Sequence, residues 1–441
     1  MEPTTLGIFS IVFLLIAMGF GLSIGLAFIL VSFVTSIFLL GGLGSAFTIL
    51  GQTMYHCIAA PSWCSIPLFI LMGAFAAIAG FGTYIYDGVY KLTRRWPGAL
   101  AIATCFGSAI FGAISGSSLA NTAIFGKLVL PEMDRYKYDR TFSIACVASA
   151  GTFANMIPPS INFIIFALFT EQSIARLFAA GVIPGILTAF VYSISIAYRV
   201  KKNPELAPHE INKAKLTMKE KQDAFKNLLP IILVVGVVFI GMYTGVFSPT
   251  EAAAAGCLVT LSAGVLKKNI THIKDLREPL RDSANTTAMM FIINVGALLF
   301  SRIFALTDIP QNMALFVQNW DVPRFVILLA ILLIYFFLGM IMVEIGIYAL
   351  TLPILMPIII SLGYDPIWFG VIVLKLSEIA AITPPVGLNV YMAKAVAGKG
   401  VTLEQIFKGI WPFCLCDIAV LILLVIFPQI SLWLPNLLMG K

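Results

Sequence analysis

The chain has 441 residues, of which 60% are hydrophobic and 11% are charged, and its mean hydropathy is +0.98. About a quarter of the residues of a soluble domain are charged, so this composition excludes an ordinary soluble domain. The first charge-free run extends from residue 3 to residue 86. Because a bilayer helix needs about 20 apolar residues, the sequence predicts an all-α polytopic membrane protein.

The net charge of +7 does not indicate a nucleic-acid partner, because the basic residues lie in short connections between apolar runs. Such connections are typical of cytoplasmic loops of a protein in a lipid bilayer. The seven cysteines lie mostly in or beside apolar segments, and with three histidines they show no metal-binding spacing. We interpret the cysteines as small buried hydrophobic residues.

Two series of elements are expected in chain order. The first half is expected to contain three spans (6–22, 24–42 and 62–81), an amphipathic connection (82–96) and a hairpin (98–130). A broken span (141–169) and a returning span (176–199) follow. A polar cytoplasmic linker is expected at 206–226. The second half repeats this order, with three spans (228–246, 250–266 and 285–306) and a hairpin (324–357). A broken span (367–394) and a last span (405–430) follow.

Prolines recur at a constant distance across the two halves. The pair Pro97 and Pro323 is separated by 226 positions, as are Pro131 and Pro357 and the two Pro-Pro dipeptides at 158–159 and 384–385. Such a period indicates an internal duplication. The sequence therefore predicts one repeat at 1–205 and a second at 227–441.

The charges of the loops predict how the two repeats are oriented. Residues 91–97 and 131–140 are rich in Lys and Arg, whereas their partners at 316–323 and 357–366 contain neither. Equivalent loops of different charge should lie on opposite membrane faces, which is the pattern of an inverted-topology repeat. The hairpins then enter from opposite faces, and their length of about 33 residues favours re-entrant helices over two full crossings.

The tip of the first hairpin, "AISGSSLANTAIFG" at 113–126, is unusually polar for a membrane segment. Gly112 and Gly116 permit a tight reversal, and the serines place hydroxyl groups beside freed carbonyls. Oxygen ligands suit Na⁺, and a helix N-terminus suits a carboxylate. Small residues that let helices pack closely are the alternative interpretation.

Each Pro-Pro dipeptide interrupts an apolar span, in "ANMIPPSINF" at 154–163 and "AITPPVGLNV" at 381–390. A double proline removes two backbone donors and leaves carbonyls unpaired. Repeated in register with the hairpins, the two breaks predict a pair of oxygen-rich sites near the membrane midplane. Asn155, Thr383 and Asn389 are the side chains expected to contribute.

Few ionisable residues lie inside the predicted spans, and such residues are functional candidates because charge is costly in lipid. Glu344 is in register with Ser118, so it belongs to the second hairpin tip and is a candidate for binding a cation or a proton. Lys375 and Glu378 are three positions apart on one helix and are expected to form an ion pair. Arg302 is expected either to bind an anionic substrate or to reach the membrane interface.

Four segments resemble the large membrane subunit of tripartite ATP-independent periplasmic (TRAP) transporters, the DctM-like family. They are the hairpin segment "GAISGSSLANTAIFGKLVLPEM" (112–133), "GMYTGVFSPTEAAAAG" (241–256), "LGMIMVEIGIYALTLPILMPI" (338–358) and "ITPPVGLNVYMAKAVAG" (382–398). The resemblance covers essentially the whole chain. It implies an elevator-type transporter of the ion-transporter superfamily that couples import of an organic acid to Na⁺, without an organic cofactor.

The resemblance also implies site residues and partners. For Na⁺, the expected residues are Ser115, Ser118, Asn155, Pro158, Gly339, Glu344, Thr383, Pro384 and Gly387. For the substrate, the expected residues are Ser117, Asn121, Asn162, Arg302 and Asn389. The expected partners are a separate small four-helix membrane subunit and a periplasmic substrate-binding protein, with the complex in the bacterial inner membrane. A departure from the family's usual Ala-rich hairpin at Asn121 leaves the particular acid open.

Two other functional classes remain as alternatives. An intramembrane enzyme needs a nucleophile with its base or metal ligands at membrane depth, and the three histidines lie near predicted helix ends or in the linker. A channel formed by the facing hairpins would instead pass ions through a continuous pore. We therefore expect a transporter and not an enzyme.

Overall fold

The computed structural model describes residues 2–208, 217–318, 322–398 and 400–440, with no side-chain description at 314 and 316–318. In these residues all regular secondary structure is helical, as predicted. Seven helices are long and apolar enough to cross a membrane, or eight if the bent pair Arg140–Met156 and Ile161–Thr170 forms one span.

The first half contains eleven described α-helices in the predicted order. They are α1 (Pro3–Gly19), α2 (Ile24–Leu39), α3 (Leu43–Ala59), α4 (Ser65–Ile78), α5 (Phe81–Thr93), α6 (Ala99–Ser115), α7 (Ser118–Arg135), α8 (Arg140–Gly151), α9 (Phe153–Met156), α10 (Ile161–Thr170) and α11 (Ile174–Lys202). Helix α3 was not predicted, because its glycines, Gln52 and His56 lower its hydropathy below that of its neighbours. The hairpin α6–α7 and the broken helix α8–α10 lie where the sequence indicates.

The second half contains the remaining described helices. They are α12 (Met218–Tyr243), α13 (Pro249–Leu266), α14 (Arg277–Ala305), α15 (Ile309–Gln318), α16 (Arg324–Gly339), α17 (Glu344–Ser361), α18 (Pro366–Ile382), α19 (Leu388–Ala397), α20 (Leu403–Ile426) and α21 (Gln429–Met439). Helix α12 begins at residue 218, inside the segment 206–226 that is predicted as a linker; residues 209–216 of that segment lie outside the described residues.

Side-chain caps explain where several second-half helices begin. Thr217 with Glu220, Ser248 with Glu251, and Thr402 with Gln405 form capping boxes at α12, α13 and α20. Each box satisfies two backbone N–H groups that the first helical turn leaves free. The capping box at Thr217 therefore starts α12 inside the polar segment, before the apolar run that the sequence analysis took as its beginning.

The packing of the hairpins repeats with the period of the prolines to within one residue, because Gly112 and Gly339 are 227 positions apart. A Cβ atom on Gly112 of α6 would lie 2.8 Å from the Cα of Ala154, and one on Gly339 of α16 would lie 2.6 Å from the Cβ of Ala380. Ala154 and Ala380 are separated by the same 226 positions as the proline pairs. Glycine thus allows each hairpin to lie directly against its broken helix.

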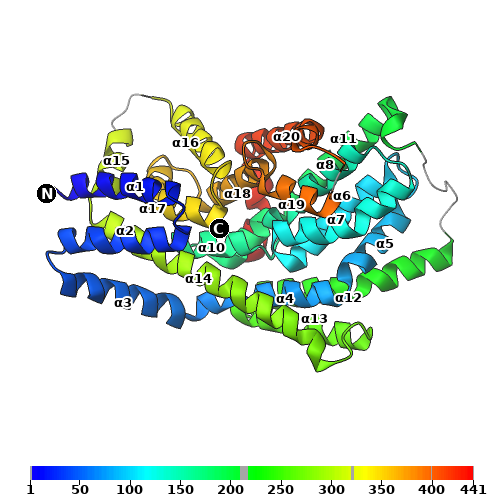
Figure 1. Ribbon diagram of the computed structural model, residues 1–441, viewed down its shortest axis with the longest axis horizontal. Coiled ribbons are helices and arrows are strands. Elements are labelled where there is room, and N and C mark those ends of the chain that lie inside the picture. The colour runs from blue at the N-terminus through cyan, green and yellow to red at the C-terminus, as the bar shows by residue number, and fades with distance from the viewer. Residues whose placement is uncertain (1, 209–216, 319–321, 399, 441) are drawn as a thin grey trace.

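The arrangement places the chain breaks in the middle of the molecule. In Figure 1, α1, α2 and α3 lie together at the left, and the first hairpin, α6 and α7, lies at the right. The ends of α10, α17, α18 and α19 lie between these groups, and the long helix α14 passes across them. The centre of the molecule is therefore built from helix ends, and it contains the candidate site.

Candidate transport site

The first hairpin reverses at Gly116, where the sequence analysis places its tip. Gly116 has a φ of +60°, in the left-handed region, and its N–H donates to the carbonyl of Gly112 at 2.9 Å. Ser117 then caps α7 by accepting a hydrogen bond from the N–H of Ala120 at 3.4 Å. A Cβ on Gly116 would lie 3.2 Å from the carbonyl oxygen of Pro159, so the tip packs on the first helix break.

The second half also contains a helix reversal and an interrupted helix, with different residues at the turns. Helix α16 ends at Gly339 and α17 begins at Glu344, while α18 ends at Ile382 and α19 begins at Leu388. Gly387, with a φ of +61°, precedes α19. The Pro-Pro peptide bonds of both breaks are cis. Each half therefore brings one reversal and one interrupted helix to the centre.

A hydrogen bond connects the two halves at this point. The side-chain amide Nδ2 of Asn155, in α9 of the first break, donates to Oε1 of Glu344 at 3.1 Å. The two residues are 189 positions apart in the chain. The structure thus brings together an amide and a carboxylate that the sequence analysis selected.

A cavity of about 210 Å³ lies beside this contact. Its lining combines both hairpin tips, both breaks and one face of α14, and among the predicted residues it includes Ser117, Ser118, Asn155, Asn162, Glu344 and Asn389. The contribution of α14, which consists of Thr286, Met289, Met290 and Ile293, was missed. Nothing in the α14 sequence distinguishes that face from ordinary helix packing.

Four helix N-termini line the cavity. The first residues of α7, α10, α17 and α19 are Ser118, Ile161, Glu344 and Leu388, and all four belong to the lining. Free backbone N–H groups and the helix dipole make such N-termini favourable for an anion. Among the described residues, no Lys or Arg belongs to the lining. The positive potential available to a carboxylate therefore comes from backbone dipoles.

Unpaired side-chain oxygens in and around the site suit a cation. The Oγ of Ser115, the Oγ of Ser160 and the Oδ1 of Asn389 are buried and have no hydrogen-bond partner among the described residues. Asn389 donates through Nδ2 to the carbonyl of Ala148 at 3.4 Å. A buried polar atom without a partner costs free energy, and a bound Na⁺ would supply the missing partner for an oxygen.

A second cavity of about 440 Å³ lies on the other side of the second hairpin tip. Gly339 and Gly387 line it, together with residues 338–343 and the ends of α1 and α2. Thr383 is buried but donates its hydroxyl to the carbonyl of Ile379 at 3.0 Å, while Pro384 is exposed and Pro158 is buried. The residues expected for the second Na⁺ thus lie around the second break and are less enclosed than those around the first.

Two predicted substrate residues lie away from both cavities. Asn121 is fully buried between helices, where its Nδ2 donates to the carbonyls of Ser108 at 3.0 Å and Gly151 at 3.3 Å. Arg302 lies near the C-terminal end of α14 and donates to the hydroxyl of Thr53 on α3 at 3.0 Å. Asn121 therefore stabilises the packing of the first hairpin on α8, and Arg302 forms a hydrogen bond between α14 and α3.

A buried ionic cluster lies next to the broken helices. The ammonium group of Lys375 donates to Oε2 of Glu378 and to Oδ1 of Asp417, both at 2.7 Å, and to Oγ1 of Thr188 at 3.1 Å. Tyr192 donates to the other oxygen of Asp417 at 2.6 Å. The expected pair of Lys375 with Glu378 is present, but the sequence analysis missed Asp417. Its position within the apolar run 405–430 was the available signal.

These features define a class of protein. Interrupted helices that meet in hairpin tips, a central cavity lined by helix N-termini, and at least seven apolar helices are typical of secondary transporters.

The comparison with known families then identifies this one. The family described as "Tripartite ATP-independent periplasmic transporter, DctM component" matches residues 9–430. The chain belongs to this family. The large permease protein DctM of a C4-dicarboxylate TRAP transporter of Pseudomonas aeruginosa is 32% identical over 374 residues, which are 84% of this chain and 86% of that protein.

Other relatives carry names with different substrates. The sialic acid TRAP transporter large permease SiaM of Vibrio cholerae is 29% identical over 95% of this chain and 96% of its own length. The ectoine/5-hydroxyectoine large permease UehC of Ruegeria pomeroyi is 30% identical over 98% of this chain and 99% of its own length. These relatives are named as transporter permeases and not as enzymes.

Solved structures agree on the fold. The YdaH transporter of Alcanivorax borkumensis has a TM-score of 0.61 at 13% identity and covers 90% of each chain. MtrF of Neisseria gonorrhoeae has a TM-score of 0.58 at 16% identity, over 98% of this chain and 95% of its own. The polytopic all-α transporter fold that the sequence analysis predicted is confirmed.

Proposed function

We propose that this protein is the membrane subunit that imports a small organic acid together with Na⁺ in a TRAP transporter. The observation that carries the proposal is the cavity beside the Asn155–Glu344 contact, where four helix N-termini converge and Asn389, whose Oδ1 is unpaired, lines the wall. The names of the relatives, which include C4-dicarboxylate and sialic acid permeases, support an organic acid as the substrate class.

The proposed coupling follows from the charge of Glu344. A carboxylate substrate at the helix N-termini would stand beside the ionised Glu344 in a site with little water, where like charges repel strongly. A Na⁺ ion bound by oxygens next to Glu344 would cancel this repulsion. Substrate and Na⁺ would therefore bind more tightly together than separately, which is the thermodynamic requirement for symport.

We assign the residues of the two Na⁺ sites by their place in the fold. The first site would use Ser115, Ser118, Asn155 and the carbonyls around Pro158. The second would use Glu344, Thr383 and the backbone at Gly339, Pro384 and Gly387. Ser117, Asn162 and Asn389 would contact the substrate from the remaining cavity wall.

We further propose that the two halves form an inverted-topology repeat with re-entrant hairpins, moving as an elevator. The basic loops at 91–97 and 131–140 and the recurrent glycine contacts Gly112–Ala154 and Gly339–Ala380 support the repeat. The α14 face at the cavity would then be the fixed wall against which hairpins and broken helices move.

The family supports two protein partners, a periplasmic substrate-binding protein and a small membrane subunit. An isethionate permease of Oleidesulfovibrio alaskensis is named DctMQ, and this chain matches 57% of its length. We propose that the complex lies in the bacterial inner membrane and receives its substrate from the binding protein.

Uptake by proteoliposomes containing all three proteins tests the function. Succinate and sialic acid serve as probes, with an inward gradient of Na⁺ or of K⁺. We expect accumulation of one probe only with Na⁺ and only with the binding protein present. Equal accumulation with K⁺ would refute the coupling, and ionic currents without saturation would indicate a channel instead.

A further inference from the structure

A groove at the end of α11 lies away from the transport site. It has a volume of about 680 Å³ and lies between α11 and α20. The end of α11 belongs to the same face as the basic loop at 131–140, because the N–H of Asp139 donates to the carbonyl of Leu206 at 3.0 Å. The last turn of α11 carries Arg199, Lys201 and Lys202.

The groove changes from polar to apolar along its length. Arg199, Lys202 and Asn203 line it at the helix end, whereas Val191, Leu415 and Ala419 line it further into the apolar run. Val191 and Lys202 are eleven residues apart on one helix, which corresponds to roughly 16 Å. This gradient matches an amphiphile with a polar head at the membrane surface and a chain along the helices.

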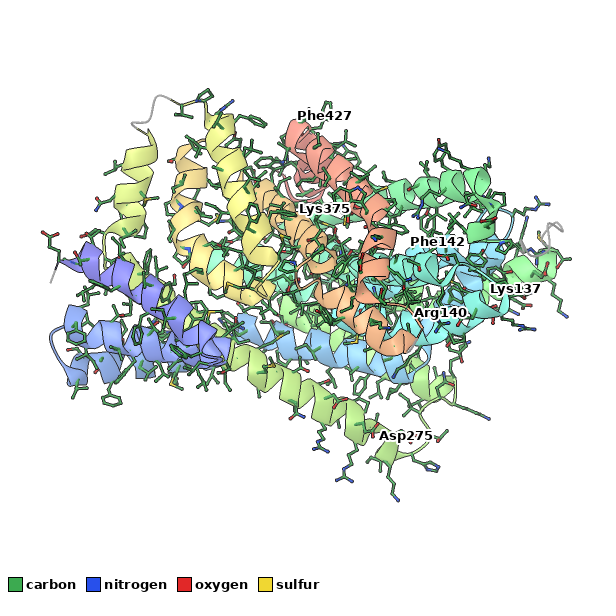
Figure 2. All side chains as sticks on the ribbon, turned by 45° about the horizontal axis from the view of Figure 1, so that its top comes forward. Lys137, Arg140, Phe142, Asp275, Lys375 and Phe427 are labelled. Atoms are coloured by element: carbon green, nitrogen blue, oxygen red, sulfur yellow. The ribbon has the colours of Figure 1, made fainter. Side chains whose placement is uncertain are left out.

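The guanidinium group of Arg199 at the polar end is held by aromatic rings, and one of its nitrogen atoms lacks an acceptor among the described residues. The guanidinium group of Arg199 lies over the rings of Phe142 at 5.1 Å and Phe413 at 5.4 Å. Its Nη1 is buried without a hydrogen-bond partner among the described residues. Figure 2 shows Phe142 near Arg140, at the basic end of the molecule. The stacked rings fix the guanidinium group in place, and because Arg199 is only half-buried and lines the groove, the part of the group that faces the groove can meet an oxygen anion.

The nearby acidic groups do not neutralise this end. The carboxylate of Asp139 accepts the N–H of Phe142 at 2.7 Å and thereby caps α8. Glu205 is exposed in the short helix that follows α11. Neither acid forms an ion pair with Arg199 or Lys202 among the described residues. The segment from residue 198 to 206 therefore keeps an excess of positive charge.

We propose that this groove binds an anionic phospholipid. Its phosphate would accept hydrogen bonds from Arg199, with Lys202 as a second cation, and one acyl chain would lie along Val191, Leu415 and Ala419. Basic pockets between membrane helices are suited to anionic headgroups. A zwitterionic lipid carries no net negative charge to match the two cations.

The purified protein in detergent allows a direct test by native mass spectrometry. The probes are dioleoyl phosphatidylglycerol and dioleoyl phosphatidylcholine, which have the same acyl chains, and inorganic phosphate. Lys202→Gln removes a groove cation, and Lys201→Gln is the matched control because Lys201 does not line the groove. Ala419→Trp fills the apolar end at an exposed position.

We expect the wild type to retain phosphatidylglycerol in preference to phosphatidylcholine. Lys202→Gln should weaken retention about fivefold, Lys201→Gln should leave it unchanged, and Ala419→Trp should weaken it without change in charge. Equal retention of both lipids, or equal effects of the two lysine variants, would overturn the proposal. Displacement of phosphatidylglycerol by millimolar phosphate with no effect of Ala419→Trp would also overturn it, because the site would then bind a free anion.

Discussion

The buried ionic cluster allows the sharpest stability prediction, the effect of Lys375→Met. All three charged side chains of the cluster, those of Lys375, Glu378 and Asp417, are 0% exposed. Methionine would leave two carboxylates without a counter-charge, and Glu378 would lose the only hydrogen bond that the structure records for its side chain. Breaking a buried ion pair by removing one partner costs about 3–5 kcal/mol, so we expect a loss in that range.

Reversible unfolding in mixed micelles measures this loss as a change in the free energy of unfolding. Lys408→Met is the control, because Lys408 pairs with Glu404 at 2.8 Å with both side chains more than 70% exposed. Such an exposed pair contributes little to stability, because solvent screens it. A loss for Lys375→Met no larger than that of the control would refute the reasoning.

A combined variant separates lost charge balance from lost packing. Lys375→Met together with Glu378→Gln and Asp417→Asn contains no buried charge in the cluster. Replacing a whole buried ionic group by neutral residues of similar volume is often close to neutral in stability. We expect the triple variant to regain most of the loss, and a triple variant as unstable as the single one would show that packing dominates.

The remaining predictions concern the candidate site and its support. Glu344→Gln should remove one site's share of the stabilisation by Na⁺ relative to K⁺ in thermal unfolding, which for a site at 100 times its Kd is worth about 2.7 kcal/mol; undiminished stabilisation would exclude Glu344 as a ligand. Gly339→Ala should destabilise by about 1–3 kcal/mol because its Cβ would lie 2.6 Å from Ala380, whereas Gly236→Ala, with its nearest neighbour at 3.9 Å, should not. Asn121→Ala should lower stability by about 1–3 kcal/mol with unchanged substrate affinity in uptake assays, and a raised KM would return Asn121 to the substrate site.

The repeat made much of the site predictable from sequence. The register that pairs Ser118 with Glu344 placed both residues at hairpin tips, and the structure puts both in one cavity. The period of the repeat and the breaks in its helices could be read from the sequence, because proline and glycine determine the backbone conformation locally. The cavity wall on α14, including Met289, could not be predicted, because its role depends on which helix packs there.

Side-chain partners were harder to predict than positions. Asn121 lies in the same polar hairpin as Ser118, but the chain turns its amide towards backbone carbonyls of α6 and α8. The role of Arg302 was equally ambiguous. A single cation inside a predicted span is known to be costly in lipid, but the sequence does not indicate which residue binds it. Asp417 could have been recognised as an acid in an apolar run, although its pairing with Lys375 across 42 residues required the fold.

The two halves are not equivalent at the site, and the difference has a mechanical consequence. The register partner of Asn155 is Ala381, and that of Glu344 is Ser118. One half therefore contributes the amide and the other the carboxylate of the hydrogen bond between Asn155 and Glu344. A cation beside this bond would be held by groups from both halves at once. In the proposed Na⁺-coupled mechanism, its release would remove one of the contacts between the first break and the second hairpin tip, so cation occupancy would change how these two segments are held together.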